Sequence, residues 1–310
     1  LAERKLPVFI ISGNHDSPER LSFANRLIDA AGIHLAPVYN GVVEPITLSD
    51  EYGPVNVYML PFIKPAHVRG FFPDTEITGY SDAVAAAIGR MNIDKTQRNV
   101  LITHQFVTGA QRSDSEELSV GGTDNIGAEV FCDFDYVALG HIHGPQNMDS
   151  GRIRYCGSPL KYSFSEAAQQ KSVTVAELKE KGTLEIHTVP LIPRRDMVEL
   201  KGSYQQLTLR ESYENTTYQE DYTHITLTDE EDIPDAVAKL RAVYHNLMKL
   251  DYDNTRTRHS AAISGAENVE TRSPIDLFAE FYELQNGLPM SAEQTELVAA
   301  LIEKIWEGEE

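Results

Sequence analysis

Cysteine is scarce in this chain: Cys132 and Cys156 are the only two among 310 residues. Two cysteines are too few for the disulfide framework of a secreted domain, and they are not spaced for a structural zinc site. No apolar run approaches the roughly 20 residues that span a bilayer, and the N-terminus lacks the basic and apolar regions of a signal peptide. These absences indicate neither membrane insertion nor secretion, and we expect a reducing, cytoplasmic setting.

Basic residues are also few, since 27 Lys and Arg face 47 Asp and Glu and the net charge is −20. An evenly spread negative charge would argue against binding to nucleic acid. The excess is concentrated, however: residues 267–310 carry −9, from eleven acidic and two basic residues, and residues 201–240 carry −6, from nine and three. The rest of the chain is only mildly acidic, so the total charge does not exclude a polyanionic substrate.

What the chain does contain is a series of short apolar runs, and its 41% hydrophobic content supports the core of one large domain and a smaller one. Apolar residues with helical spacing follow Ser17, which we expect to cap a helix that ends at Gly32. Ser81 is expected to cap an alanine-rich helix that reaches about Met91. Along the chain, predicted strands first alternate with helices and then follow one another directly. This order predicts an α/β sandwich. The predicted strands are Val8 to Ile11, Val57 to Leu60, Val100 to Thr103, Tyr136 to Leu139, Ile153 to Tyr155, Val173 to Leu178 and Leu184 to Val189.

Two histidines follow the predicted strand at Tyr136 to Leu139, because Gly140 breaks that strand just before His141 and His143. Side chains at i and i+2 of an extended segment point the same way. Neutral imidazole is a common ligand for divalent transition metals, so the pair could form half of a metal site. Taken alone, the pair is equally compatible with two solvated histidines on a loop.

Two further strand ends carry similar side chains: Asn14 and His15 follow the first strand, and His104 follows the strand at Val100 to Thr103. Ligands of open α/β sheets gather at the carboxyl ends of strands, so coincidence becomes the weaker explanation. An asparagine oxygen and several imidazoles, with carboxylates expected nearby, suit a hydrolytic site for Mn²⁺, Fe²⁺ or Zn²⁺.

These motifs, in this order, resemble those of the calcineurin-like metallophosphoesterases, whose signatures include Gly-Asn-His-Asp, a lone His after a strand, and Gly-His-x-His. The resemblance is closest to the SbcD-type nuclease subunits and covers nearly the whole chain. The segments that carry it are Ser12 to Leu21, Leu101 to Val107, Asp135 to His143, Tyr155 to Glu166 and Pro274 to Tyr282.

The resemblance implies a metallophosphoesterase β-sandwich flanked by helices, with two metal ions that hydrolyse a phosphodiester. It implies that Asn14, His104 and His141 hold one metal and that His143 joins the ligands of the other. His15 would lie beside the scissile phosphate, where it stabilises developing charge or protonates the leaving oxygen, and Asp16 would orient it. The implied metal is Mn²⁺, with Mg²⁺, Fe²⁺ or Zn²⁺ as alternatives.

The chain departs from this family at its beginning. The family starts with an Asp-x-His motif and a Gly-Asp motif, and only a few residues precede Gly13 here. We therefore expect that the chain has lost its beginning and that the full-length protein is a nuclease. The present chain should bind metal weakly and be nearly inactive, because four neutral ligands cannot balance two adjacent dications.

We expect three domains, with a nuclease domain at 1–193, a capping domain at 194–272 and a helical hairpin at 273–310. The capping domain is predicted from the strand Tyr222 to Leu227 and an amphipathic helix from Pro234 to Leu250. By resemblance it helps to select DNA. A generic α+β appendage is the alternative.

The hairpin is predicted from a helix start at Ser273 to Asp276, a stop at Asn286 and Gly287, and a capping box of Ser291 with Gln294. Apolar residues from Leu297 to Trp306 then form one stripe along the second helix. The stripe can pack inside the hairpin, dock on a partner helix, or do both. The resemblance implies docking on an SbcC-type coiled-coil ATPase, with a homodimer inside a heterotetramer.

Three functions remain open, and the first is the one that the resemblance implies. The first is the nuclease subunit of an SbcCD-like DNA repair complex near the nucleoid, acting as an exonuclease on double-stranded ends and an endonuclease on single strands or hairpins. The second is a metallophosphoesterase for a small phosphodiester or a phosphoprotein. The third is a non-catalytic scaffold that binds DNA or the ATPase, which applies if the native chain starts at Leu1.

Overall fold

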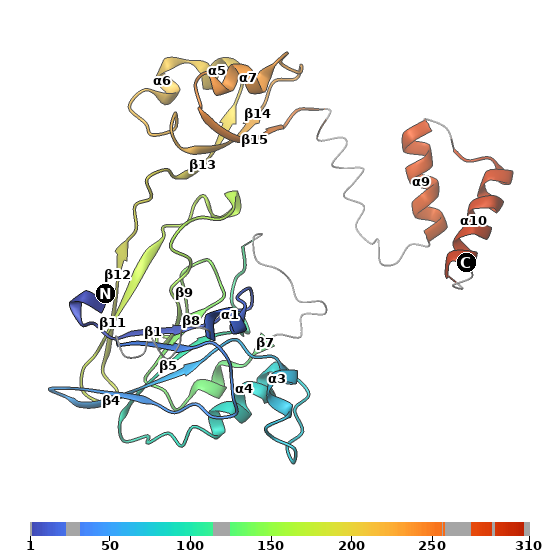
Figure 1. Cartoon of the computed structure of the whole chain (residues 1–310). Coiled ribbons are helices and arrows are strands. Elements are labelled where there is room, and N and C mark those ends of the chain that lie inside the picture. Colours follow the sequence, from blue (N-terminus) through green and yellow to red (C-terminus); the bar gives the residue numbers. More distant parts are fainter. Residues whose placement is uncertain are drawn as a thin grey trace.

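The computed structural model describes residues 2–22, 32–113, 125–255, 257, 274–286 and 289–306. It shows a larger domain built around a six-stranded sheet, a smaller domain with a three-stranded sheet, and a pair of helices near the C-terminus (Figure 1). The predicted α/β class is confirmed. Within the described residues, no helix combines the length and the hydropathy that crossing a bilayer requires.

The larger domain alternates strands with short helices in its first half and consists mainly of strands in its second half. Its elements are the 3-10 helix Ala2–Arg4, β1 (Val8–Ile11), α1 (Pro18–Ser22), β2 (Ile33–Ala36), β3 (Ile46–Asp50), β4 (Gly53–Leu60), α3 (Pro65–Arg69), α4 (Tyr80–Gly89), β5 (Arg98–His104), β6 (Phe106–Val107), β7 (Asn125–Ile126), the 3-10 helix Ala128–Phe131, β8 (Tyr136–Gly140), β9 (Gln146–Asp149), β10 (Ile153–Tyr155), the 3-10 helix Phe164–Glu166, β11 (Ser172–Leu178) and β12 (Leu184–Pro190).

The central sheet has the order β3-β4-β5-β8-β10-β9. Its four middle strands run parallel, while β3 and β9 are antiparallel at the two edges. β1 and β2 form a separate parallel pair, and β1 contacts β4 and β5. Because parallel strands end at the same side of a sheet, the segments that follow β5 and β8 emerge together.

The core lies where the central strands pack against α4. Parallel strands covered on both faces read as nearly continuous apolar runs, which explains why they were visible in the sequence. The α4 side chains Ala83, Val84 and Ala87 are fully buried against this core. The strand residues that form it include Tyr58, Leu60, Leu101, Val137, Leu139, Ile153 and Tyr155.

Helix α4 begins differently from the prediction, because Gly79 and not Ser81 is its N-cap residue. The carboxylate of Asp82 accepts hydrogen bonds from the backbone N–H groups of Thr78 and Gly79, both at 3.0 Å, and from the Thr78 hydroxyl at 2.6 Å. These bonds, that of the Thr78 hydroxyl above all, hold the pKa of Asp82 below its usual value. Ser81 lies inside the helix, and its hydroxyl accepts a hydrogen bond from the N–H of Gly127 at 3.2 Å. The predicted cap was therefore wrong.

A buried arginine ties two hairpins to the central sheet. Arg98, at the start of β5, is only 2% exposed. Its guanidinium donates to the carboxylate of Asp50 and to the carbonyl oxygens of Gly53 at 2.7 Å, Leu178 at 2.9 Å and Lys179 at 3.1 Å. The hydrogen bond from Arg98 lowers the pKa of Asp50. One side chain thus joins the β3–β4 and β11–β12 hairpins to the middle of the sheet.

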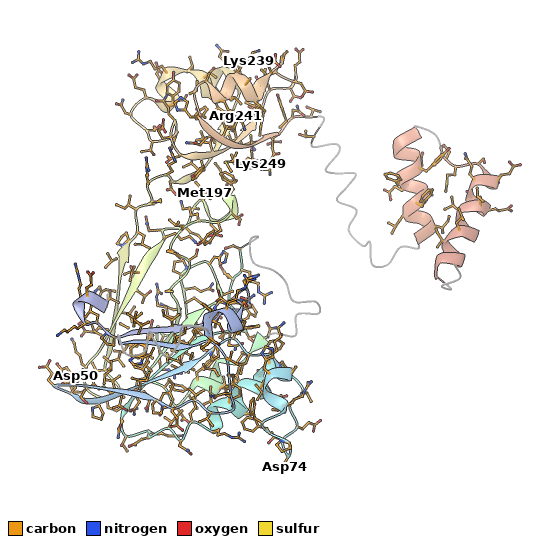
Figure 2. All side chains as sticks on the ribbon, in the orientation of Figure 1. Asp50, Asp74, Met197, Lys239, Arg241 and Lys249 are labelled. Carbon is orange, nitrogen blue, oxygen red and sulfur yellow. The ribbon has the colours of Figure 1, made fainter. Side chains whose placement is uncertain are left out.

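The smaller domain places short helices on one face of a parallel sheet (Figure 1). Met197 stands where the chain enters it (Figure 2). Tyr244 is fully buried in its core, and the Tyr244 hydroxyl donates to the carbonyl of Leu207 at 2.7 Å. Its elements are β13 (Met197–Gly202), α5 (Tyr204–Thr208), α6 (Arg210–Tyr213), β14 (Tyr222–Leu227), α7 (Ala236–Arg241) and β15 (Asn246–Tyr252).

The predicted helix from Pro234 to Leu250 is wrong in its second half. α7 ends at Arg241, and the chain turns into β15, which pairs in parallel with β14. Leu240 and Leu247 are both buried, but the first lies on a helix and the second on a strand. The spacing of the apolar residues in this segment is compatible with a helix or a strand. Pairing with β14 provides hydrogen bonds for its backbone and therefore favours the strand.

The last two helices are α9 (Pro274–Asn286) and α10 (Ala292–Trp306). The predicted capping box is confirmed: the N–H of Gln294 bonds to the Ser291 hydroxyl at 3.3 Å, and the N–H of Ser291 bonds to the Gln294 side chain at 2.8 Å. The Gln294 amide also donates to the Tyr282 hydroxyl at 3.0 Å, which links the two helices. Ser273, Gly287 and the side chains of Ile305 and Trp306 lie outside what the structure describes.

We expect Arg98→Met to lower the free energy of unfolding by about 3 kcal/mol, because three partly buried carbonyl groups and the Asp50 carboxylate would lose their donor. The matched control is Arg210→Met, since Arg210 is exposed and pairs with Glu214 on the surface of α6. That control should change stability by less than about 0.5 kcal/mol. Chemical denaturation measures both, and equal losses for the two variants would contradict the role given to Arg98.

Candidate functional site

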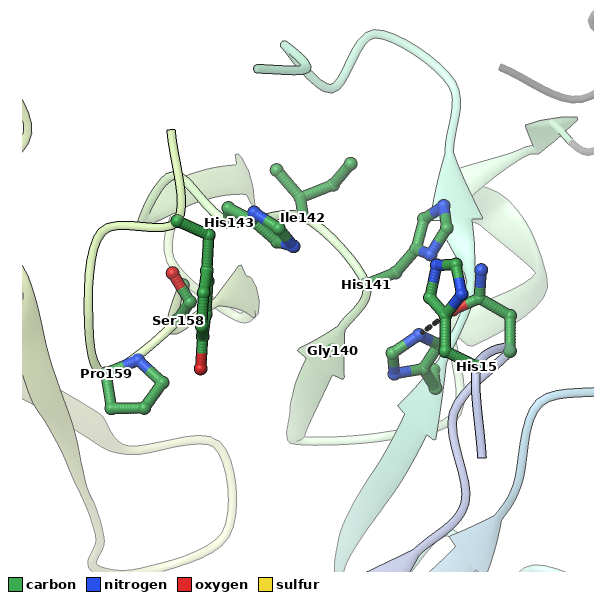
Figure 3. A pocket seen from close by; sticks show the side chains of 11 residues that line it. His15, Gly140, His141, Ile142, His143, Ser158 and Pro159 are labelled. Atoms are coloured by element: carbon green, nitrogen blue, oxygen red, sulfur yellow. Dashed lines mark hydrogen bonds between the residues drawn. The ribbon is translucent and has the colours of Figure 1, made fainter. Parts of the chain in front are cut away.

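The ends of β1, β5 and β8 bring polar side chains into one pocket of about 480 Å³ (Figure 3). The predicted site residues Asn14, His15, His104, His141 and His143 all line it, whereas Asp16 is not among its lining residues. The other residues of its wall are Gly140, Ile142, Gly157, Ser158, Pro159 and Tyr162.

The loop after β1 is fixed by backbone and side-chain hydrogen bonds. Ser12 is buried, and its hydroxyl donates to the carbonyl of Pro37 at 2.6 Å, just after β2. The carbonyl of Ser12 accepts from the N–H of Phe62 at 3.0 Å, just after β4. The Asp16 carboxylate accepts from the N–H of Gly13 at 2.7 Å and closes the turn that carries Asn14 and His15. The bond described for Asp16 therefore braces the loop rather than His15.

His104 is the centre of the cluster. Its Nε2 lies 2.9 Å from Oδ1 of Asn14, and its ring centroid lies 5.2 Å from that of His141. A Cβ atom on Gly13 would stand 2.8 Å from Cε1 of His104, and one on Gly140 would stand 2.8 Å from its Nδ1. Both distances are too short for a real side chain. The two glycines are therefore needed here to make room for the imidazole.

Burial changes the protonation of His104. Desolvation, with a smaller contribution from the positive charge that His141 can carry, lowers the pKa of His104 to about 4. The imidazole therefore stays neutral at physiological pH, and only the neutral ring can offer a lone pair to a metal.

His141 and His143 do not point the same way, which corrects the expectation from their spacing. The backbone of His141 has a φ of 107°, so the chain leaves the extended conformation where β8 ends. In Figure 3 His141 lies toward His15, while His143 lies on the other side of the pocket near Ser158. A positive φ at a non-glycine residue is costly and is typical of functional sites.

His143 has its own set of contacts. Its Nδ1 lies 3.0 Å from Oε1 of the buried Glu166, and its ring centroid is 5.6 Å from that of Tyr162. Its carbonyl accepts from the N–H of Ser158 at 3.0 Å, in a turn where Gly157 has a φ of 79°. Sequence reasoning assigned Glu166 no role, because it lies 23 residues after His143 and no spacing rule connects the two.

The donor types fit a divalent transition metal, but the charge is incomplete. Asn14, His104 and His141 gather on one side of the pocket and offer only neutral oxygen and nitrogen donors. In the part of the chain that the structure describes, no three His, Cys, Asp or Glu side chains converge so as to hold a metal ion. The nearby carboxylates of Asp16 and Glu166 are engaged elsewhere, with Gly13 and with Lys171. The described residues of the pocket thus offer neutral donors of the kind that bind transition metals, without a carboxylate converging on them.

Comparison with known proteins gives the family. A family model described as the type 5 capsule protein repressor C-terminal domain (SbcD_C) matches residues 193–286. The chain is 31% identical to the SbcD subunit of the nuclease SbcCD from Staphylococcus epidermidis, over 99% of this chain and 80% of that protein. It is 29% identical to the corresponding SbcCD nuclease subunit from Staphylococcus saprophyticus, over 98% of this chain and 80% of that protein. The chain belongs to the family of SbcD-type nuclease subunits.

Proposed function

We propose that this protein is the nuclease subunit of an SbcCD-type complex and that it hydrolyses phosphodiester bonds of DNA. The observation that carries the proposal is the cluster of Asn14, His104 and His141 at the ends of neighbouring strands, with the exposed His15 on the same pocket. The names of the two relatives support it, since both are nucleases of this complex. Its substrates would be double-stranded ends, single strands and hairpins.

The proposed cofactor is a pair of Mn²⁺ ions, with Mg²⁺, Fe²⁺ or Zn²⁺ as alternatives. Asn14, His104 and His141 would hold one ion, and His143 would contribute to the other. Two bound ions lower the pKa of a water molecule and stabilise both oxygens of an in-line displacement. The protein's part is to keep His104 neutral and to hold the donors in place through Gly13 and Gly140.

His15 is the residue proposed to act on the substrate itself. It is exposed, it lines the pocket, and it comes directly after Asn14 on a loop that Ser12 and Asp16 hold in place. Its imidazole would donate a hydrogen bond to a phosphate oxygen or a proton to the leaving oxygen. Asp16 would act indirectly, by fixing the loop.

The smaller domain is proposed to be a capping domain that helps to select DNA. It contacts the segment that borders the pocket: Asp196 pairs with Lys161 at 2.8 Å, and His224 packs on Phe164 with ring centroids 5.3 Å apart. Basic side chains of this domain include Lys239, Arg241 and Lys249 (Figure 2). These contacts connect the domain to the rim of the pocket, but residues 201–240 are acidic overall, so individual basic side chains and not the net charge of the domain would meet DNA.

The hairpin of α9 and α10 is proposed to dock on the coiled-coil ATPase of the complex, within a heterotetramer that contains two copies of each subunit. Large apolar side chains of both helices are exposed, with Phe281 60% and Leu297 62% accessible. A phosphatase for small molecules or phosphoproteins has no use for such a surface, which disfavours that alternative.

A non-catalytic scaffold is the second candidate function. The observation in its favour is the lack of converging carboxylates among the described residues. A scaffold would bind DNA or the ATPase through the same hairpin and capping domain, but its pocket would bind no metal pair. Metal content and nuclease activity of the full-length protein separate the two candidates.

We expect His15→Ala to lower the nuclease kcat of the full-length protein by about 100-fold or more, which corresponds to about 3 kcal/mol of transition-state stabilisation. The bound Mn²⁺ should not change, because His15 faces the substrate. His245→Ala is the control, since His245 is an exposed histidine that pairs with Glu220 in the smaller domain. Full activity in the His15 variant, or loss of its metal, would overturn the assigned role.

We expect Ile302→Asp, in the stripe of α10, to weaken binding to the ATPase by at least about 100-fold, because a buried, unpaired carboxylate costs several kcal/mol. Ala299→Asp places the same charge at an exposed position of the same helix and serves as control. Co-purification and a melting curve are the measurements. Undiminished association with a lower melting temperature would mean that the stripe only packs inside the hairpin.

A further inference from the structure

A buried ion pair lies directly behind His143. Glu166 is fully buried and Lys171 is only 4% exposed. One carboxylate oxygen of Glu166, Oε1, lies 3.0 Å from Nδ1 of His143, and the other, Oε2, accepts from Nζ of Lys171 at 2.6 Å. The carboxylate therefore bridges an ammonium group and the imidazole.

Lys171 connects this bridge to the rim of the pocket. Besides Glu166, three further acceptors surround its ammonium and share its remaining two N–H groups: the carbonyl of His143 at 2.9 Å, the hydroxyl of Ser158 at 2.9 Å and the side-chain oxygen of Gln169 at 2.7 Å. The backbone and the side chain of His143 are thus held by the same two residues. A buried ion pair is expensive to desolvate and adds little net stability, so its presence calls for another explanation.

The explanation lies in the chemistry of the imidazole. An ionised carboxylate can only accept hydrogen bonds, so a neutral His143 must carry its proton on Nδ1, and its lone pair is then on Nε2. Carboxylates that fix a histidine in this way are typical partners of metal-binding histidines. His224 provides a contrast, because both of its ring nitrogens meet carboxylates, those of Glu199 and Asp251.

We propose that Glu166 is a positioning residue that fixes the Nδ1–H tautomer of His143, and that Lys171 offsets the charge of this buried carboxylate. The inference rests on the proposed function, because it assigns the Nε2 lone pair of His143 to a divalent cation in the pocket. It adds Glu166 and Lys171 to the residues on which that function depends.

The tautomer can be observed without metal or substrate. Long-range ¹H–¹⁵N correlation spectra at about pH 8, where an unperturbed imidazole is neutral, distinguish the two ring nitrogens. The unmodified protein should show the Nδ1–H form of His143. An Nε2–H form would overturn the proposal without the need for any variant.

Glu166→Gln should invert the tautomer. A glutamine has one oxygen, and the ammonium of Lys171 competes for it with a charge-assisted bond. The amide NH₂ group is then left facing Nδ1 of His143, which must accept, and the proton moves to Nε2. The affinity for Mn²⁺, measured by calorimetry, should fall by about 10-fold to 100-fold. Retention of the Nδ1–H form in this variant would contradict the proposal.

Two further variants separate positioning from stability. Lys171→Met should lower the melting temperature, because it leaves a buried carboxylate unpaired, but the carboxylate still accepts from Nδ1 and the tautomer should persist. Glu185→Gln removes the carboxylate of an exposed Lys–Glu pair with Lys179 and should change neither quantity. If Lys171→Met changed the tautomer of His143 as well as the melting temperature, the tautomer would depend on general stability. Glu166 would then have only a structural role.

The outcomes also separate this inference from the proposed function. A correct Nδ1–H tautomer in a full-length protein that neither binds Mn²⁺ nor cuts DNA would refute the nuclease proposal and leave the positioning of His143 intact. An active nuclease with the Nε2–H form would refute only the role given to Glu166.

Discussion

The packing of one imidazole between two glycines is the constraint on which the candidate site depends. The ring of His104 fills the space beside Gly13 and Gly140, which lie at the ends of two other strands. This close approach is possible because β5 and β8 are parallel and in register, with His104 opposite Gly140. The same contact excludes water from His104, which lowers its pKa and keeps the ring neutral. Sheet topology, glycine placement and protonation are therefore consequences of one arrangement.

Charge is the second constraint. The described donors are neutral, and the carboxylates of Asp16 and Glu166 hold the loop at Gly13 and the imidazole of His143. Each carboxylate thus acts on the geometry of a donor rather than as a donor itself. A metal pair would need negative charge from groups outside this set of described donors.

Much of this arrangement could be predicted from the sequence, because buried parallel strands are continuous apolar runs and polar residues stand out where each run stops. The capping box of Ser291 and Gln294 was predictable because it is local. The helix expected through Leu247 failed, since pairing of β15 with β14 is non-local and its apolar spacing suits both structures. The divergent histidines depend on one backbone angle at His141, and the role of Glu166 depends on a tertiary contact, so neither could be read from spacing.

One short segment joins the two domains to the pocket. Phe164 and Glu166 belong to the same 3-10 turn, Phe164–Glu166. Phe164 packs on His224 of the smaller domain, and Glu166 bonds to His143 of the pocket. Lys161, just before this turn, pairs with Asp196 at the entry to the smaller domain. Two backbone hydrogen bonds close this turn, from the N–H of Glu166 to the carbonyl of Ser163 at 3.0 Å and from the N–H of Ala167 to the carbonyl of Phe164 at 2.9 Å. The contact with the smaller domain and the contact with His143 therefore come from three consecutive residues, so this turn supports both the domain interface and one side of the pocket.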